Sequence, residues 1–397
     1  MDVASFRATV VWTFLLGCLV ALADDGPAAG ATEEARISVR WTSEGLVRRP
    51  QQPPTGGNAI RAGGAVYLAG DERGRVVALD RRTGRVRWRS SPGRGHWALL
   101  QGATRRVVVV SSVDRVVALD ARTGQVRWEL SLAALGLHGY QAVTSVATEP
   151  TIAVGVSRSG EGPSPPPAVL GVSSSDGALR WHTDLTPDTE LTFPSPATDG
   201  TDAVFVTTPS GPERGDNVAH LLALDSGRMH WATGLGGFQA FGVLPALLGD
   251  ESVLLQPVRT SADLDQSRTA GRTTSVGRSD GAVQWTVDGI LSTRIGREVW
   301  GIEATGAVVV LDRHTGARVR TVRDPRPSDD MFASRLVDLG AGRIGVVAVD
   351  RLTVIDRRGR RLATTRLRAP LVAPLIVERG GVIATTADDV TTAYAIR

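Results

Sequence analysis

A thirteen-residue stretch occurs twice near the start of the chain, and this repeat limits the possible folds more than any other feature. "VVALDRRTGRVRW" (Val76–Trp88) returns forty residues later as "VVALDARTGQVRW" (Val116–Trp128), with eleven of thirteen positions identical. A four-residue apolar run is typical of a buried strand. Asp80 can accept hydrogen bonds from the backbone of the following turn, and Gly84 can adopt the positive φ that a hairpin needs. Each copy therefore predicts a strand, a tight turn and a second strand.

Weaker copies continue along the chain, each aligned by the position of its tryptophan. The seven residues at this position are Trp88, Trp128, Trp181, Trp231, Trp285, Arg320 and Ala363. The five tryptophans are 40 to 54 residues apart, which is the period of a four-stranded propeller blade and not that of a helical array.

The two ends of the chain together supply an eighth blade. "GVIATTADDVTTAYAIR" (Gly381–Arg397) provides two strands, and "RISVRWTSEG" (Arg36–Gly45) contains an unpartnered strand with Trp41. If Trp41 lies on the outer strand of the last blade, the ring closes and no sheet edge stays open. We predict an all-β chain that forms an eight-bladed β-propeller, with four-stranded antiparallel blades, over residues 35–397.

The first residues resemble an export signal. An apolar run from Ala8 to Ala23 precedes two aspartates and is short for a membrane-spanning helix. We assign residues 1–23 to a signal peptide or membrane anchor and 24–34 to a linker. Three possibilities stay open: cleavage after Ala23, lipidation of Cys18, or an uncleaved anchor. Each places the propeller outside the cytoplasm, in secreted or envelope-associated form.

Charge and titratable residues argue against several functions. All 45 basic residues are arginines, the net charge is +4, and the arginines are spread along the chain, so we expect no nucleic-acid partner. The six histidines are scattered without a zinc-binding spacing. We predict no catalytic residue and no metal site, and we expect a monomer.

The repeat "ALDxxTGxxxW" resembles that of the quinoprotein-type, or PQQ-like, propeller family, which includes pyrroloquinoline-quinone (PQQ) dehydrogenases and the outer-membrane assembly lipoprotein BamB. The resemblance extends over residues 35–397 and is closest to BamB in size and features. It implies that one tryptophan of each blade docks on the neighbouring blade. In this sequence the docking residues would be Trp41, Trp88, Trp128, Trp181, Trp231 and Trp285.

The dehydrogenases in this family carry a vicinal disulfide, a calcium ion and a catalytic aspartate. Cys18 is the only cysteine of this chain, and no acidic cluster stands apart from the turn aspartates. We therefore expect no cofactor and a non-enzymatic scaffold that binds a protein partner at the cell envelope. A PQQ-dependent dehydrogenase and a ligand-sensing or adhesion propeller are the alternatives.

Two apolar connections between blades are the candidate partner site. They contain Leu135, Leu137 and Tyr140 in one and Phe238 and Phe241 in the other. Apolar side chains on exposed loops mark interaction surfaces, but the same side chains could instead plug the mouth of the central channel. The sequence leaves both interpretations open.

Overall fold

A computed structural model of the chain shows the propeller as one compact unit, Glu34–Arg397. The structure describes residues 35–44, 46, 59–69, 74–92, 99–112, 114–158, 165–191, 196–209, 217–235, 242–258, 272–288, 290–295, 297–303, 307–322, 335–348, 350–369, 371, 376–378, 380–386 and 390–397. None of the helices within these ranges is long and apolar enough to cross a membrane.

Thirty-three strands are described, numbered in chain order. Those of the first half are β1 (Ile37–Glu44), β2 (Ala59–Ala62), β3 (Ala65–Ala69), β4 (Val76–Asp80), β5 (Val86–Ser90), β6 (Leu99–Ala103), β7 (Val107–Ser112), β8 (Arg115–Asp120), β9 (Val126–Ser131), β10 (Tyr140–Ala147), β11 (Thr151–Arg158), β12 (Ala168–Ser173), β13 (Leu179–Asp184), β14 (Thr189–Leu191), β15 (Ala197–Thr198), β16 (Asp202–Pro209), β17 (Val218–Ala223) and β18 (Met229–Gly234). Those of the second half are β19 (Gly242–Leu248), β20 (Ser252–Val258), β21 (Arg272–Gly277), β22 (Val283–Asp288), β23 (Ile290–Ile295), β24 (Glu298–Glu303), β25 (Val308–Leu311), β26 (Arg318–Val322), β27 (Arg335–Gly340), β28 (Arg343–Ala348), β29 (Arg351–Asp356), β30 (Arg361–Arg366), β31 (Ile376–Glu378), β32 (Gly381–Thr385) and β33 (Val390–Ile396).

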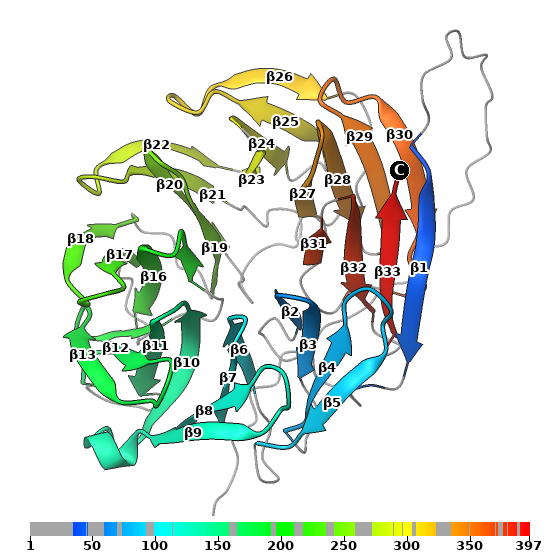
Figure 1. Cartoon of the computed structure of the whole chain (residues 1–397). Coiled ribbons are helices and arrows are strands. Elements are labelled where there is room, and N and C mark those ends of the chain that lie inside the picture. The colour runs from blue at the N-terminus through cyan, green and yellow to red at the C-terminus, as the bar shows by residue number, and fades with distance from the viewer. Residues whose placement is uncertain are drawn as a thin grey trace, which may run out of the picture. The chain divides into compact units, whose positions relative to one another are not determined.

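These strands form eight antiparallel sheets arranged as the blades of a ring (Figure 1). Blades one to seven begin at β2, β6, β10, β14, β19, β23 and β27, and each uses consecutive strands, which we call A to D from the centre outward. Blade four has a fifth strand, because β14 and β15 both pair with β16. One 3-10 helix, η1 (Ala133–Leu135), lies between blades two and three. The predicted eight-bladed propeller is confirmed.

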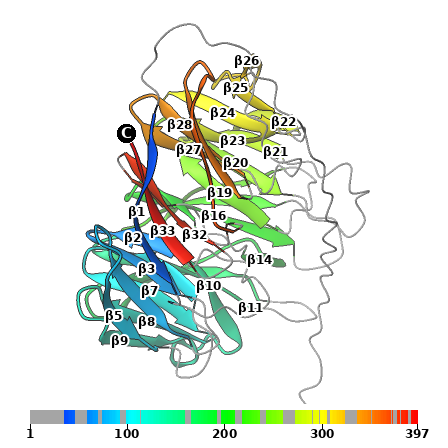
Figure 2. The same cartoon turned by 90° about the vertical axis from the view of Figure 1, so that its right-hand side faces the viewer.

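Blade eight joins the two ends of the chain, as the sequence predicts. Its strand order is β31, β32, β33 and then β1, so the outer strand comes from the N-terminal side (Figures 1 and 2). The register pairs Ile37 with Ile396 and Trp41 with Ala393. Arg36 and Arg397 also exchange two backbone hydrogen bonds, at 3.0 and 3.1 Å. The N-terminal strand therefore closes the ring.

The core lies between adjacent blades. The buried apolar residues of the described chain fall into eight clusters, and each cluster combines two consecutive blades. The cluster that closes the ring brings Trp41 and Ile383 of blade eight against Val66 and Leu79 of blade one. We call each of these contact zones a seam. Because burial of apolar surface is the main stabilising term, the ring depends on its seams.

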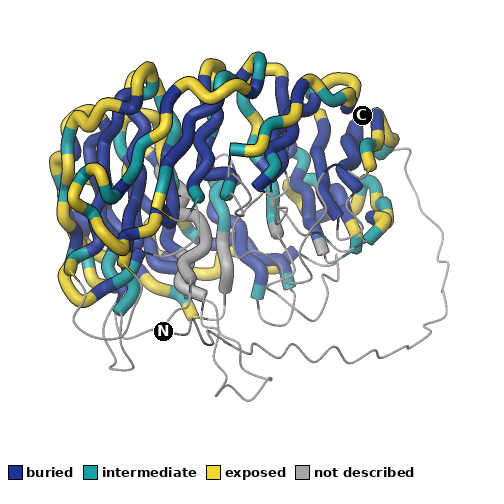
Figure 3. The backbone as a smooth tube through the Cα atoms, turned by 90° about the horizontal axis from the view of Figure 1, so that it is seen from below, coloured by how far each residue is buried: buried dark blue, intermediate teal, exposed yellow. Residues whose placement is uncertain are grey.

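Burial changes from the inner to the outer strands of a blade. Every residue of β3 and β12 is buried, whereas β5 and β9 alternate and expose their arginines. Figure 3 shows buried residues along the strands and exposed residues mainly at the turns and outer edges. Five outer strands, β1, β5, β9, β18 and β22, therefore bury one side chain each, and that side chain is the repeat tryptophan.

Candidate functional site

The six predicted docking tryptophans each reach from the outer strand of one blade to the C–D turn of the next. Five of them are at most 8% exposed, and Trp181 is half-buried. A buried indole N–H needs a hydrogen-bond acceptor, and each of these donates to a backbone carbonyl of the following blade. The pairs are Trp41 with Arg81 (2.9 Å), Trp88 with Ala121 (3.0 Å), Trp128 with Ser174 (3.2 Å), Trp181 with Leu224 (3.2 Å), Trp231 with Arg278 (2.8 Å) and Trp285 with Arg313 (2.8 Å).

The turn glycine of the next blade lies directly under each indole ring. A Cβ built on Gly84 would be 2.5 Å from the ring of Trp41, and one on Gly124 would be 2.5 Å from the ring of Trp88. These glycines also have positive φ, +71° and +75°. Glycine is therefore needed at these positions for two reasons: its backbone can adopt positive φ, and it has no Cβ to clash with the indole ring. Only the first reason can be recognised from the sequence.

The turn aspartate holds the turn together from inside the blade. Asp80 Oδ1 accepts hydrogen bonds from the backbone N–H groups of Arg82 and Thr83, both at 3.0 Å. Asp80 Oδ2 also pairs with Arg87 at 2.6 Å. The Arg87 guanidinium, aided by the Thr83 and Arg82 donors, lowers the pKa of Asp80 to about 2. This aspartate stays ionised and positions the glycine beneath the indole.

At three seams the residue whose carbonyl accepts the indole hydrogen bond is an arginine, and its side chain forms a second link across the same seam. Their side chains pair with carboxylates in the A–B turn of the preceding blade, and we call these pairs the arginine latches. They are Arg81 with Glu378 (3.3 Å), Arg278 with Asp199 and Asp202 (2.9 Å to Asp202), and Arg313 with Glu251 (3.4 Å). The latches were not predicted from the sequence, because they join turns from different blades.

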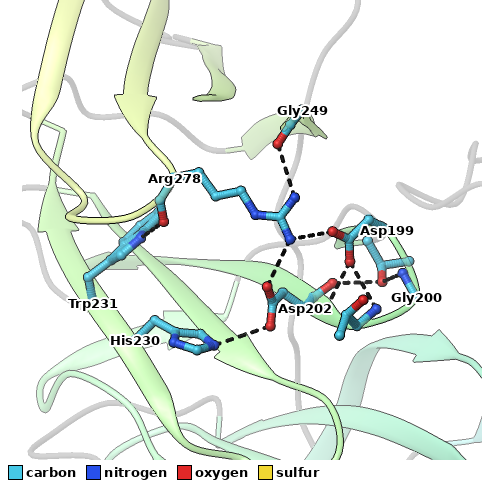
Figure 4. A network of polar contacts seen from close by, with 9 residues as sticks. Asp199, Gly200, Asp202, His230, Trp231, Gly249 and Arg278 are labelled. Atoms are coloured by element: carbon cyan, nitrogen blue, oxygen red, sulfur yellow. Dashed lines mark hydrogen bonds and ion pairs between the residues drawn. The ribbon is translucent and has the colours of Figure 1, made fainter. Parts of the chain in front are cut away.

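The latch between blades four and five is the most extensive of the three (Figure 4). The guanidinium of Arg278 contacts Asp199 and Asp202 and donates to the carbonyl of Gly249 at 3.2 Å. His230, on the outer strand of blade four, lies 3.2 Å from Asp202 through Nε2. The neighbouring Trp231 donates to the carbonyl of the same Arg278. Such a group of charged residues can resemble a ligand-binding site, but here the groups form hydrogen bonds and ion pairs with one another across the seam.

Blade six replaces the docking tryptophan with a different arrangement. Arg320 is paired with Val310 in the register that the tryptophans occupy, and its guanidinium lies 5.0 Å from the ring centre of Trp300. The glycine of the next blade, Gly359, is instead covered by Val322, whose Cγ1 would be 2.1 Å from a Cβ built there. Val322 is 3% exposed. A valine two residues further along the strand therefore occupies the place of the indole.

The first apolar connection, between blades two and three, packs against the propeller itself. Leu132 is fully buried, and Tyr140 is 8% exposed with its hydroxyl donating to the carbonyl of Pro166 at 3.0 Å. Tyr140 belongs to the core, so its prediction as an exposed partner anchor is wrong: its hydroxyl is satisfied internally and its ring fills the seam. Leu135 and Leu137 are half-buried against the same cluster. Phe238 and Phe241 lie outside the described residues.

A calcium ion of the kind found in quinone enzymes needs several oxygen ligands close together. Among them there is no group of three or more histidine, cysteine, aspartate or glutamate side chains that could hold a metal ion. Of the described histidines, His220 is buried inside blade four, where its Nε2 is 3.1 Å from Thr207 Oγ1. Burial lowers the pKa of His220 to about 4. His220 is thus a neutral interior residue at neutral pH.

Comparisons with known proteins agree with the geometry. The family model of the outer membrane protein assembly factor BamB matches residues 30–287. A search of curated protein sequences gives no match.

Solved structures share the fold at low sequence identity. BamB from Moraxella catarrhalis superposes with a TM-score of 0.61 at 16% identity, covering 91% of this chain and 100% of its own. A europium-containing methanol dehydrogenase gives 0.59 at 13%, covering 88% and 84%. The quinohemoprotein alcohol dehydrogenase from Comamonas testosteroni gives 0.51 at 14%, covering 85% and 67%. With its family model matched over more than half of its length, this chain belongs to the BamB outer membrane protein assembly factor family.

Proposed function

We propose that the protein is an exported, non-enzymatic propeller scaffold that binds a protein partner at the cell envelope. This proposal rests on the observation that the repeated residues serve the contacts between blades. The tryptophans, turn glycines and turn aspartates, which are the most regular chemical features of the chain, all hold blades together. Function then belongs to residues outside the repeat, on the connections between blades.

Leu135 and Leu137 are the apolar residues best placed for such a contact. They follow the outer strand of blade two and are only partly covered by the core cluster beneath them. Their segment is fixed by backbone hydrogen bonds, in which the N–H groups of Leu135 and Leu137 both reach the carbonyl of Leu132 at 3.0 Å. A rigid apolar loop loses little conformational freedom when it binds, which favours affinity.

Membership of the BamB family supports outer membrane protein assembly as the setting, and the apolar run that ends at Ala23 supports export. The experiment is crosslinking capture from cell envelopes with the full-length chain and its L135S/L137S variant. We expect capture of one protein to weaken more than tenfold, about 1.4 kcal/mol, in the variant. Val126, an exposed apolar residue on the outer strand of the same blade, provides the matched control V126S.

A folding defect would be recognised by a lower melting temperature of L135S/L137S. The second variant, H138E, changes an exposed residue of the same loop and places a charge beside both leucines. Equal capture by the wild type, L135S/L137S and H138E would contradict this binding site.

A PQQ-dependent dehydrogenase is the second candidate, because solved enzymes of this kind share the fold. Addition of PQQ and calcium to the full-length chain, followed by a dye-linked oxidation assay with alcohols and sugars, tests it. Turnover above that of the heat-denatured chain would replace the scaffold proposal with an enzymatic one.

A further inference from the structure

An open pocket of about 360 Å³ lies on blade seven, on the face opposite to the connection that carries Leu135 and Leu137. It forms where the A–B turn and the C–D turn of the blade meet. Its lining is Gly342, Asp356, Arg357, Arg358 and Arg360. Three of the five lining residues are exposed arginines, so the pocket is strongly cationic.

The carboxylate that neutralises this position in other blades is missing from the described residues here. Arg81 and Arg313, which directly follow the turn aspartate in blades one and six, pair with Glu378 and Glu251 of the preceding blades. Arg357 follows the turn aspartate of blade seven in the same way. The A–B turn of blade six carries an exposed arginine, Arg297, and the carboxylate that follows it, Glu298, pairs with Arg320 of its own blade at 3.4 Å. Among the described residues, the seam between blades six and seven therefore lacks the ion pair that Arg81 and Arg313 form at their seams.

The one carboxylate in the pocket is already engaged. Asp356 Oδ1 accepts the backbone N–H groups of Arg358 and Arg360, both at 2.9 Å. Asp356 Oδ2 pairs with the Arg360 guanidinium at 3.2 Å. Within the described part of the chain, neither Arg357 nor Arg358 has a carboxylate within ion-pair distance. Two guanidinium groups at this pocket therefore have hydrogen-bond donors available.

The surrounding blade adds to the positive potential. Residues 335–368 contain nine arginines and three aspartates, a net charge of +6, whereas the whole chain has +4. The rest of the chain is thus at −2, and the positive excess is concentrated in this blade. A local field of this kind attracts anions to the pocket and raises their association rate.

We propose that the pocket of blade seven binds a phosphate-bearing ligand. Guanidinium groups form planar, paired hydrogen bonds with phosphate oxygens, and a phosphate dianion can accept from two arginines together. A single carboxylate offers one such edge, so it can pair fully with only one of Arg357 and Arg358. The volume, at the low end of the range for small-molecule sites, suits a phosphate group with a small attached moiety.

The test is calorimetric titration of the full-length chain with inorganic phosphate and with glycerol 3-phosphate at low ionic strength. The variant R357Q/R358Q removes the two arginines that have no carboxylate partner among the described residues. The matched control R82Q/R85Q removes two exposed arginines from the corresponding turn of blade one and changes the net charge equally. We expect the dissociation constant to rise at least tenfold in R357Q/R358Q and to stay within twofold in R82Q/R85Q. If the double variant loses its cooperative unfolding, R358Q alone is compared with R82Q.

Further titrations separate the possible ligands. Binding of glycerol 3-phosphate supports a soluble phosphate ester, and flotation with vesicles containing phosphatidylglycerol, but not with pure phosphatidylcholine, supports a lipid headgroup. Hexaglutamate serves as an acidic peptide. Binding of hexaglutamate without binding of any phosphate probe would overturn the proposal, as would equal loss of phosphate binding in R357Q/R358Q and R82Q/R85Q. Equal flotation with both vesicle types, without binding of a free phosphate, would overturn it too.

Discussion

The ring of Trp41 lies against Gly84 so closely that a Cβ on the glycine would approach it to 2.5 Å, although the two residues are on the last and the first blade. The same tryptophan donates its indole N–H to the carbonyl of Arg81. One residue near the N-terminal side thus fixes the C–D turn of blade one to the outer strand of blade eight. Closure of the ring and the ordinary contact between blades use the same chemistry.

Replacement of Gly84 with alanine should destabilise the ring through a clash with Trp41. We expect a loss of about 3 kcal/mol, of which about 1 reflects a left-handed backbone and the rest overpacking. Gly136 also has a positive φ, +80°, but no described atom lies within 4 Å of the position that a Cβ would take there, so G136A measures the backbone cost alone. Denaturant unfolding of both variants gives the difference. Equal losses would show that the Trp41 ring moves aside freely.

Removal of β1 should destabilise all the blades together. Without residues 35–44, β33 becomes an open edge and the turn of blade one loses Trp41. We expect the melting temperature to fall by many degrees relative to a chain that starts at residue 35. A truncated chain that melts at the same temperature as this control would mean that the other seven seams hold the ring without closure.

Val322 should contribute to stability as the substitute for the missing tryptophan of blade six. V322A removes the group that covers Gly359, and we expect it to cost about 1–3 kcal/mol. V319A on the same strand is the control, because Val319 is 62% exposed and should change stability by less than about 0.5 kcal/mol. Chemical unfolding together with hydrogen exchange of β26 reports both effects. Similar stability of the two variants would assign the seam to other contacts.

The protein should lose stability in mild acid because of His220. Its pKa is about 4 in the folded chain, below the ordinary value near 6.5. The unfolded chain therefore binds the proton first as the pH falls, so the contribution of His220 is complete above pH ~6.5 and is lost progressively towards pH ~4. The loss is on the order of 3 kcal/mol.

Comparison of unfolding free energies at pH 7 and pH 5 checks this for the wild type and H220Q. The exposed His138 gives the control H138Q. The pH dependence of stability should be weaker in H220Q than in the wild type and in H138Q. An unaltered slope in H220Q would assign the acid sensitivity to the carboxylates.

Repetition made the fold predictable from the sequence. The spacing of the tryptophans indicated the number of blades, and the unpaired strands at Trp41 and at the C-terminal end indicated the closure. Tyr140 shows the limit of such reasoning, because apolar residues in a connection look alike whether they bury themselves or face a partner. The packing of its ring in the seam and the position of the Pro166 carbonyl beside its hydroxyl make Tyr140 a core residue.

The sequence by itself determined the strands, the turns and their glycines, because those depend on residues close together in the chain. The tertiary structure decided which surface each residue meets: that Gly84 lies under Trp41, that Arg81 faces Glu378, and that Arg357 meets no carboxylate of the described chain. These contacts join turns from different blades, and ring closure brings the first blade against the last. Local propensity carries no information on such pairs, because they depend on how the blades are stacked rather than on the order of neighbouring residues.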